Sequence, residues 1–334
     1  MSRRRLTKQQ RLRIQARRRQ LADRRAEALL KEGESGELLE GRVIVRHGRN
    51  LLVRGPDDAP VHCLFRQNLG EIVCGDRVLW QRVDGGGGVV VDRLPRDTVL
   101  SRPDFAGHDK PLAANITQLV VVLAPRPEPS GYLLDQYLVA AERIGVRGAI
   151  CLNKADLLDE AQRAAFRERF AHYPPLGYPL VQVSAKREHG LDPLLELLRD
   201  QTSILVGQSG VGKSSLINAL LPAPTLAEGE LSEATGLGRH TTSAATLYRL
   251  GSGGEIIDSP GVRSFRLGRI TREALEQGFP EIHALRGRCR FGDCTHRHEP
   301  GCAVRQAVEA GRIHPQRLAS FLHLAETLPA AGRS

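Results

Sequence analysis

The chain has 334 residues, of which 41% are hydrophobic and 26% are charged, as in ordinary soluble globular proteins. No apolar run approaches the ~20 residues of a membrane-spanning helix, and no apolar stretch follows the basic N-terminus as a secretory signal peptide requires. These features exclude a membrane-spanning protein. We therefore expect a cytoplasmic protein with no membrane partner, made of about two or three domains.

The first segment, residues 1–36, is a basic arm. Residues 1–25 hold eleven Lys or Arg side chains and one acid, Asp23, so they carry the whole net charge of +10. The remaining residues hold 37 basic and 37 acidic side chains. A basic arm on a neutral body is typical of segments that neutralise nucleic-acid phosphates and release their counterions, which predicts RNA or DNA as a partner. The alternative is a solvated tail that only aids solubility.

The second segment, residues 37–103, is rich in Val and Leu and is divided by turn signals such as His47-Gly48 and the glycine run 85–88. The expected strands are residues 38–45, 50–53, 61–65, 76–83 and 89–93. Five short strands in about sixty residues predict a small closed barrel of the oligonucleotide-binding (OB) type, whose loops commonly bind nucleic acid. An open sheet is the alternative.

The third segment, residues 104–270, alternates apolar strands with amphipathic helices. This alternation predicts a doubly wound α/β domain with a largely parallel sheet. The expected strands are residues 119–123, 148–152, 180–183, 203–206 and 255–257, and the expected helices are 132–144 and 191–198. In such sheets ligands bind at the carboxyl ends of the strands.

A phosphate-binding loop follows the strand 203–206. Its sequence, GQSGVGKS, matches GxxxxGK[ST] between a strand and a helix. Glycines let backbone amides curl around a phosphate, and the helix N-terminus points at the same anion. We expect Lys213 to reach the β- and γ-phosphates and Ser214 to ligate Mg²⁺. The predicted nucleotide contacts are Gly207, Gln208, Ser209, Gly210, Val211, Gly212, Lys213, Ser214 and Ser215.

Two further motifs predict that the base is guanine. An NKxD sequence follows the strand 148–152, and its Asp156 carboxylate can accept hydrogen bonds from the guanine N1–H and exocyclic amine, which adenine lacks at that edge. A SAK sequence follows the strand 180–183 and resembles the segment that lies over guanine in GTPases. The predicted base-side residues are Asn153, Lys154, Ala155, Asp156, Ser184, Ala185 and Lys186. An ATPase is disfavoured because ATP would leave the Asp156 carboxylate unpaired.

The catalytic motifs follow. A DxxG sequence from Asp258 to Gly261 is expected to place its carboxylate near Mg²⁺ and its glycine amide near the γ-phosphate. Thr241 and Thr242 precede it, where a switch threonine belongs. Ras-type enzymes have a water-orienting glutamine after this motif, but this chain has Val262, so hydrolysis by the protein alone is expected to be slow. His240, beside the threonines, is the candidate for orienting the water.

The order of the motifs differs from that of Ras-like GTPases. The base-reading motifs precede the phosphate loop, which predicts a circularly permuted domain. Nearby chain termini make such a permutation structurally accessible. It also leads the chain directly from DxxG into the last segment, residues 271–334.

This last segment has the spacing of a metal site. Three cysteines and one histidine, C-x4-C-x-H-x5-C, form a closed tetrahedral ligand set that predicts one structural zinc ion. The candidate ligands are Cys289, Cys294, His296 and Cys302. His298 competes with His296 by spacing, and a metal-free cluster is the alternative. The other cysteines, Cys63, Cys74 and Cys151, fall in expected strands and are interpreted as buried thiols. Helices are expected at 303–310 and 315–327.

Together these motifs closely resemble the RsgA (YjeQ) family of small-ribosomal-subunit biogenesis GTPases, over nearly the whole chain. The resemblance implies a cytoplasmic monomer that binds the small (30S) subunit and its 16S rRNA, with GTP hydrolysis stimulated by the subunit in late maturation. It implies one Zn²⁺, Mg²⁺ with GTP or GDP, and Lys213, His240 and Thr242 as catalytic residues, with Thr242 and Ser214 on Mg²⁺. It also favours His296 over His298. The alternative function is an RNA-binding scaffold that uses GTP as a structural ligand.

Overall fold

The computed structural model describes residues 37–65, 67–83, 87–103, 108–186, 190–221, 245–259 and 270–327. The chain divides after Pro95 into two compact units. Several predicted features lie outside the described residues, namely the basic arm and the residues His240, Thr241, Thr242, Gly261 and Val262.

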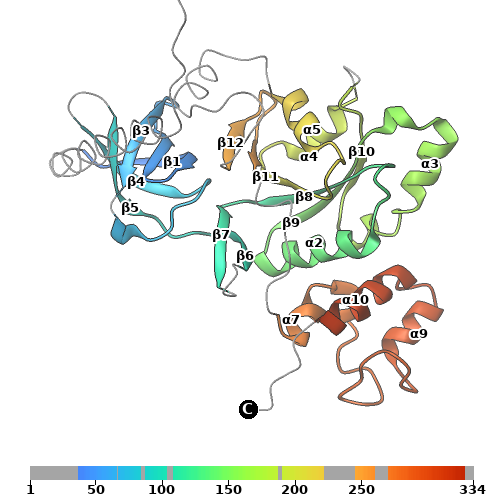
Figure 1. Cartoon of the computed structure of the whole chain (residues 1–334). Helices are drawn as coiled ribbons and strands as arrows, with labels where there is room; N and C mark the ends of the chain where they lie inside the picture. The colour runs from blue at the N-terminus through green and yellow to red at the C-terminus, as the bar shows by residue number, and fades with distance from the viewer. Residues whose placement is uncertain are drawn as a thin grey trace, which may run out of the picture. The chain divides into compact units, whose positions relative to one another are not determined.

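The first unit contains a closed five-stranded barrel (Figure 1). Its strands are β1 (Leu39–His47), β2 (Asn50–Arg54), β3 (Pro60–Phe65), β4 (Arg77–Arg82) and β5 (Gly88–Arg93). β1 pairs with β2 and β4, β3 pairs with β2 and β5, and β4 pairs with β5, which closes the ring. A short 3-10 helix, η1 (Gln67–Leu69), follows β3. This closed ring confirms the predicted OB-type barrel rather than the alternative open sheet. Closure removes the exposed strand edges that an open sheet would leave.

Trp80 fills the interior of the barrel and is fully buried. A Cβ atom at Gly88 would lie 2.6 Å from the Trp80 ring, and one at Gly41 would lie 2.8 Å from its indole nitrogen. The two glycines therefore allow the strands to pack directly against the indole. Val43, Val53 and other apolar side chains complete this core.

The second unit begins with a hairpin of β6 (Val99–Pro103) and β7 (Asp109–Ala114). β6 falls within the segment that the sequence assigned to the barrel, but it pairs with β7. The hairpin was not predicted because β7 contains Pro111 and few β-branched residues, so its sequence lacks the usual strand signal.

A six-stranded sheet follows, in the order β10-β9-β8-β11-β13-β12. The strands are β8 (Gln118–Leu123), β9 (Arg147–Leu152), β10 (Leu180–Gln182), β11 (Thr202–Val206), β12 (Thr246–Arg249) and β13 (Glu255–Asp258). All neighbours are parallel except β12, which runs antiparallel to β13. Every residue of β8 is buried, as predicted for a strand covered on both faces.

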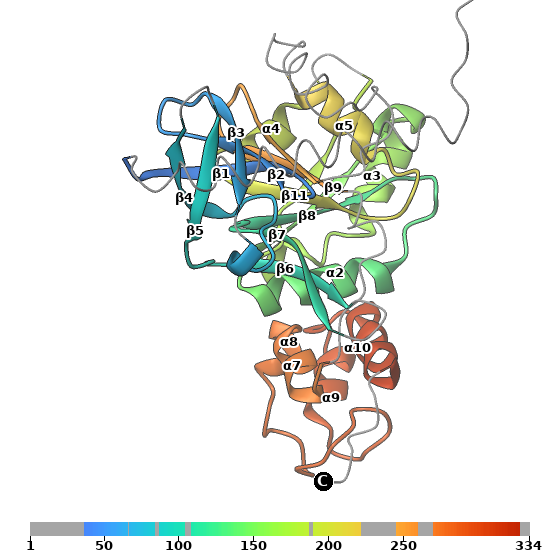
Figure 2. The same cartoon turned by 60° about the vertical axis from the view of Figure 1, so that its left-hand side comes forward.

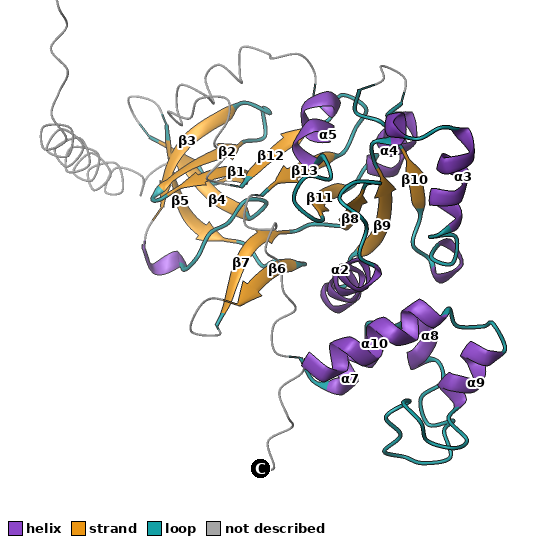
Figure 3. Cartoon of the chain, turned by 45° about the vertical axis from the view of Figure 1, so that its right-hand side comes forward, coloured by secondary structure: helices purple, strands orange, loops and turns teal. Residues whose placement is uncertain are grey.

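Helices cover both faces of this sheet (Figure 3). The helices are α2 (Gly131–Ile144), α3 (Glu160–Glu168), α4 (Asp192–Leu198) and α5 (Lys213–Leu220), with 3-10 turns η2 (Ala155–Leu157) and η3 (Pro174–Leu176). Leu194 of α4 and Leu216 of α5 share one core cluster with Val120 of β8. α2 packs on β8 and β9 from the other face, so the predicted doubly wound arrangement is confirmed.

The C-terminal region is helical and packs on α2 (Figure 2). Its helices are α7 (Arg272–Gln277), α8 (Pro280–His283), α9 (Ala303–Glu309) and α10 (Pro315–Thr327). They share a core with Val139 of α2, so the region treated as a separate segment in the sequence belongs to the same compact unit as the sheet. In the part of the chain that the structure describes, no helix has the length and apolar character needed to cross a membrane.

A buried arginine joins α10 to α2. The Arg317 side chain is fully buried, with its guanidinium 2.7 Å from Asp135 of α2 and 2.6 Å from Glu281 of α8. It also lies 4.4 Å from the centre of the Phe279 ring. Burial lowers the pKa of Arg317, but the two carboxylates outweigh burial, so the pKa is raised and the guanidinium stays charged.

The same contact region contains a stacked histidine pair, His172 and His314, whose ring centres are 3.7 Å apart. Burial and the nearby His314 and Arg317 lower the pKa of His172 to about 4, from an ordinary value of 6.5. The His172 imidazole therefore binds a proton more readily in the unfolded chain than in the folded chain. The stability from neutral His172 is present above pH 6.5 and is lost as the pH falls toward 4.

We predict that His172→Gln makes the free energy of unfolding less dependent on pH. Urea titrations at pH 7.5 and 5.5 measure the difference, with His62→Gln at an exposed barrel position as the control. An equal loss of stability on acidification in the wild type and in His172→Gln would contradict the assignment.

Candidate functional site

The phosphate loop connects the carboxyl end of β11 to the first turn of α5. Gly207, Gly210 and Gly212 have φ angles of 134°, 84° and 97°, a region that residues with a Cβ rarely occupy. A Cβ at Gly207 would also collide with the carbonyl oxygen of Val122, and one at Gly212 would lie 2.5 Å from the Asn153 amide nitrogen. The glycines are therefore required both by the backbone conformation and by close packing.

Lys213 is the first residue of α5, and its side chain folds back over the loop. Its ammonium donates hydrogen bonds to the carbonyl oxygens of Gly207, at 2.6 Å, and Gln208, at 2.7 Å. A phosphate at the helix N-terminus would meet both the ammonium and the backbone amides.

The residues of the NKxD motif contact the phosphate loop directly. Asn153 is buried and donates a hydrogen bond to the Val211 carbonyl at 2.9 Å. Lys154 donates to the Gly210 carbonyl at 2.5 Å and to the Arg126 carbonyl at 3.0 Å. The bonds to Val211 and Gly210 join residues 58 and 56 positions apart in sequence.

Asp156 and the SAK sequence form the other half of this arrangement. The Ser184 hydroxyl donates a hydrogen bond to the Asp156 carboxylate at 2.7 Å, and the Lys186 ammonium lies 3.9 Å from the same carboxylate. The Ala155 amide donates to the Val183 carbonyl, which connects the motif after β9 to the end of β10. The carboxylate is thus held in place and can accept hydrogen bonds from a bound base.

Asp258 ends β13, the strand beside β11. Its neighbour Ile257 is in register with Ile204, so the carboxylate lies at the same edge of the sheet as the phosphate loop. Of the predicted catalytic residues, only Lys213 is within the described part of the chain.

A cluster of three cysteines and one histidine lies in the C-terminal region. The ligand atoms of Cys289, Cys294, His296 and Cys302 all lie within 4.8 Å of one another. His296 Nδ1 is 3.3 Å from Cys302 Sγ and 3.7 Å from Cys289 Sγ, and the latter two sulfurs are 4.0 Å apart. Ligands about 2.0–2.3 Å from a tetrahedral ion lie at comparable separations from one another, so the group can hold a metal ion.

The structure distinguishes the two histidines that spacing left open. His296 is buried inside the cluster, whereas His298 is exposed. The second ring nitrogen of His296 lies 3.7 Å from the Glu276 carboxylate, the kind of partner that orients a metal-bound imidazole. The Glu299 carboxylate accepts hydrogen bonds from the amides of Thr295, Arg297 and His298, which fixes the intervening turn.

Motif reasoning missed two partners in these sites. The Arg126 carbonyl accepts a hydrogen bond from the Lys154 ammonium, although the loop after β8, which contains Arg126, matches no motif. The Glu276 carboxylate of α7 lies beside the His296 ring. Neither contact leaves a signal in residue spacing, because both depend on how separate elements pack.

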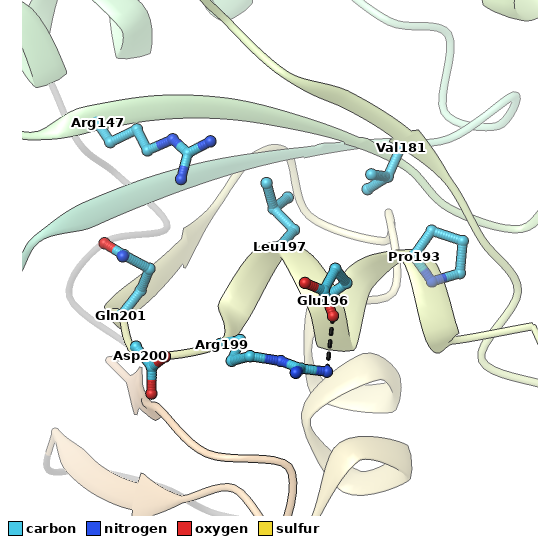
Figure 4. A pocket seen from close by; sticks show the side chains of 8 residues that line it. All are labelled: Arg147, Val181, Pro193, Glu196, Leu197, Arg199, Asp200 and Gln201. Atoms are coloured by element: carbon cyan, nitrogen blue, oxygen red, sulfur yellow. Dashed lines mark ion pairs between the residues drawn. The ribbon is translucent and has the colours of Figure 1, made fainter.

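A groove of about 510 Å³ lies away from the nucleotide motifs (Figure 4). Arg147, which begins β9, and Gln201, which precedes β11, line the groove, so it is at the amino ends of these strands. Glu196 and Arg199, which both line the groove, form an ion pair at 2.7 Å. It is therefore distinct from the carboxyl-end site.

Comparison with known proteins agrees with this geometry. The RsgA GTPase family model matches residues 93–268, more than half of the chain. The chain belongs to the RsgA GTPase family. As a member of the RsgA GTPase family, it is a GTP-hydrolysing enzyme.

Curated relatives in the RsgA family match over most of their length. The small ribosomal subunit biogenesis GTPase RsgA of Ectopseudomonas mendocina is 48% identical over 309 residues, which covers 91% of this chain and 90% of that protein. The protein of the same name from Azotobacter vinelandii is 46% identical, covering 98% of this chain and 99% of its own.

Solved structures also resemble this RsgA family member. YjeQ from Thermotoga maritima matches with a TM-score of 0.72 and 33% identity, over 89% of this chain and 100% of that chain. YloQ, described as a circularly permuted GTPase, matches with a TM-score of 0.68 and 29% identity, over 87% of this chain and 94% of its own. The predicted permutation is therefore confirmed.

Proposed function

We propose that this GTPase is an assembly factor for the small ribosomal subunit. It binds the 30S particle and its 16S rRNA late in maturation, as a monomer in the cytoplasm, and the particle stimulates its GTP hydrolysis. The names of the relatives support the ribosomal role, and the basic arm supplies charge suited to rRNA phosphates. The observation that carries the nucleotide choice is the Ser184–Asp156 hydrogen bond beside the Asn153 and Lys154 contacts to the phosphate loop.

In this proposal each motif has a defined role. The backbone from Gly207 to Ser215 surrounds the phosphates, and Lys213 neutralises the β- and γ-phosphate oxygens. Ser214 and Thr242 would hold Mg²⁺ together with Asp258, and the Gly261 amide would bind the γ-phosphate. Mg²⁺ would neutralise charge on the phosphates during transfer. His240 would orient the attacking water. Val262, which stands where Ras-type enzymes have a glutamine, has no polar group for this role.

Steady-state hydrolysis of GTP and of ATP, with and without purified small subunits, tests the proposal. We expect slow GTP turnover that rises strongly with subunits and no ATP turnover. His240→Ala should retain GTP affinity and lose the stimulated turnover. GTP turnover that is indifferent to subunits would favour the scaffold function, and full stimulated turnover in His240→Ala would remove that residue from the mechanism.

We predict that Asp156→Asn weakens GTP binding about tenfold or more without creating affinity for ATP. The amide keeps the size of the side chain but replaces one acceptor oxygen with a donor, which opposes the guanine amine. Calorimetric titration with GTP and ATP measures both affinities, and Asp192→Asn on α4 is a matched control away from the motif. Unchanged GTP affinity would contradict the assigned role.

We further propose that Cys289, Cys294, His296 and Cys302 bind one structural Zn²⁺ ion. Three thiolates and one imidazole fill all four tetrahedral positions, which suits a structural ion. Bound zinc would cross-link the turn before α9 and stabilise the C-terminal region.

His296→Ala is expected to reduce the zinc content and lower the melting temperature, because it removes the only imidazole in the cluster. His298→Ala is the matched control and should retain one zinc per chain, since that side chain is exposed. Metal analysis and calorimetry measure these outcomes. Loss of zinc in His298→Ala with retention in His296→Ala would reverse the ligand assignment.

A further inference from the structure

The imidazole of His296 presents its two ring nitrogens to different partners. Nδ1 lies 3.3 Å from Cys302 Sγ and 3.7 Å from Cys289 Sγ, inside the cluster of metal-ligand residues. Nε2 lies 3.7 Å from the Glu276 carboxylate of α7. Because a metal ion binds the imidazole nitrogen that carries no proton, this geometry makes Nδ1 the ligand atom and leaves the proton on Nε2, beside a carboxylate.

The backbone at His296 is fixed, so the ring has few other orientations. His296 has a φ angle of 63°, in the left-handed region that residues with a Cβ rarely occupy. The Glu299 carboxylate accepts hydrogen bonds from the amides of Thr295 and Arg297, on either side of it. Rotation about the side-chain bonds of His296 is therefore the remaining freedom, and it determines which ring nitrogen faces the sulfurs.

Glu276 is placed to restrict that rotation. Its side chain is only 16% exposed, and the guanidinium of Arg272, one turn earlier on α7, lies 3.9 Å from the same carboxylate oxygen. A carboxylate that is largely buried needs hydrogen-bond donors or cations around it. The Nε2–H group of His296 supplies such a donor only in the ring orientation that turns Nδ1 toward the sulfurs.

Arg272 also connects α7 to the turn that carries the ligands. Its guanidinium donates a hydrogen bond to the Cys294 carbonyl at 3.4 Å and lies 5.7 Å from the centre of the Phe321 ring of α10. Arg272 and Glu276 are four residues apart, so they project from the same face of the helix. α7 therefore contacts the ligand turn through two neighbouring side chains.

We propose that Glu276 is a positioning residue of the zinc site, which holds the His296 ring so that Nδ1 faces the ion. This inference rests on the zinc site proposed above. A carboxylate beside a ligand imidazole fixes the orientation of the ring and increases its basicity, which strengthens metal binding. A carboxylate that served only to stabilise the fold would influence the melting temperature and leave the zinc affinity unchanged.

Glu276→Ala and Glu276→Gln test this inference. Alanine removes both the charge and the acceptor oxygens, whereas glutamine keeps one acceptor oxygen in a side chain of similar size. Glu273→Gln is the matched control, because Glu273 lies on the same helix, is 69% exposed and pairs with Arg286 at 2.6 Å. The measurements on the full-length chain are zinc content, zinc affinity by competition with a chelator, the rate of zinc release and the melting temperature.

We expect Glu276→Ala to weaken zinc binding about 10- to 100-fold and to release zinc correspondingly faster. Glu276→Gln should lie between Glu276→Ala and the wild type, and Glu273→Gln should bind zinc as the wild type does. Wild-type zinc affinity in Glu276→Ala, or equal weakening in Glu276→Ala and Glu273→Gln, would overturn the inference alone. A wild-type chain that binds no zinc would overturn the zinc site and this inference with it.

A second measurement needs no variant. Nitrogen-15 NMR of the histidine rings in the zinc-loaded wild-type protein distinguishes a metal-bound ring nitrogen from a protonated one. We expect His296 to have zinc on Nδ1 and a proton on Nε2. Zinc on Nε2 would overturn the proposal, because that ring orientation presents no N–H group to Glu276.

Discussion

Lys213→Ala is expected to weaken GTP binding about 100-fold. The Lys213 ammonium bonds to the Gly207 and Gln208 carbonyls, so it is already positioned at the phosphate loop. Charged hydrogen bonds to phosphate contribute about 1.5–3 kcal/mol each, and alanine supplies none. The same variant removes the charge that stabilises the transferring phosphoryl group, so turnover should also be lost.

Calorimetric titration of GTP measures this effect, with melting temperature confirming that the variant is folded. Lys186→Ala is a suitable control, because that side chain is 80% exposed and lies 3.9 Å from Asp156, so a much smaller loss is expected. Lys213→Arg should not restore activity, since the planar guanidinium differs in shape from the compact ammonium. GTP affinity within threefold of wild type in Lys213→Ala would contradict the assigned role.

Arg317→Ala is expected to lower the free energy of unfolding by about 3–5 kcal/mol. The substitution leaves the carboxylates of Asp135 and Glu281 buried without their shared cation. It also removes the guanidinium packed on Phe279. Because these groups belong to α2, α8 and α10, the loss should loosen the contact between the sheet and the C-terminal region.

Urea denaturation of Arg317→Ala measures this loss. Arg286→Ala provides the comparison: that arginine pairs with Glu273 at 2.6 Å, but both side chains are at least half exposed, so a change below about 1 kcal/mol is expected. Similar small effects in both variants would show that the buried network contributes little. Arg317→Met should fall between the two, because it restores packing without the charge.

The chemistry of the nucleotide site was readable from local sequence. The phosphate loop needs glycines in particular backbone conformations, and the observed φ angles of Gly207, Gly210 and Gly212 show why these residues occur there. Five of the six strands of the sheet were equally predictable, since burial on both faces requires continuous apolar runs such as residues 119–123. β12, which has only four residues, was not predicted. The β6–β7 hairpin lacked such a pattern and was missed.

The contacts between these segments were harder to predict from the sequence. Spacing alone left His296 and His298 as alternatives, and burial in the folded chain distinguishes them. Arg317 gave no sign of its role, because a charged residue in an amphipathic helix is normally assigned to the exposed face. Its burial depends on carboxylates supplied by α2 and α8.

The sequence by itself determined most of the strands, the order of the motifs and the nucleotide class, because each depends on residue types within a short stretch. Only the tertiary structure decided the Ser184–Asp156 bond, the Arg317–Asp135 ion pair and the attachment of the C-terminal region to α2. These features join residues 28 to 182 positions apart. Their geometry is set by how strands and helices pack, and local residue patterns do not encode which distant partner satisfies a buried polar group.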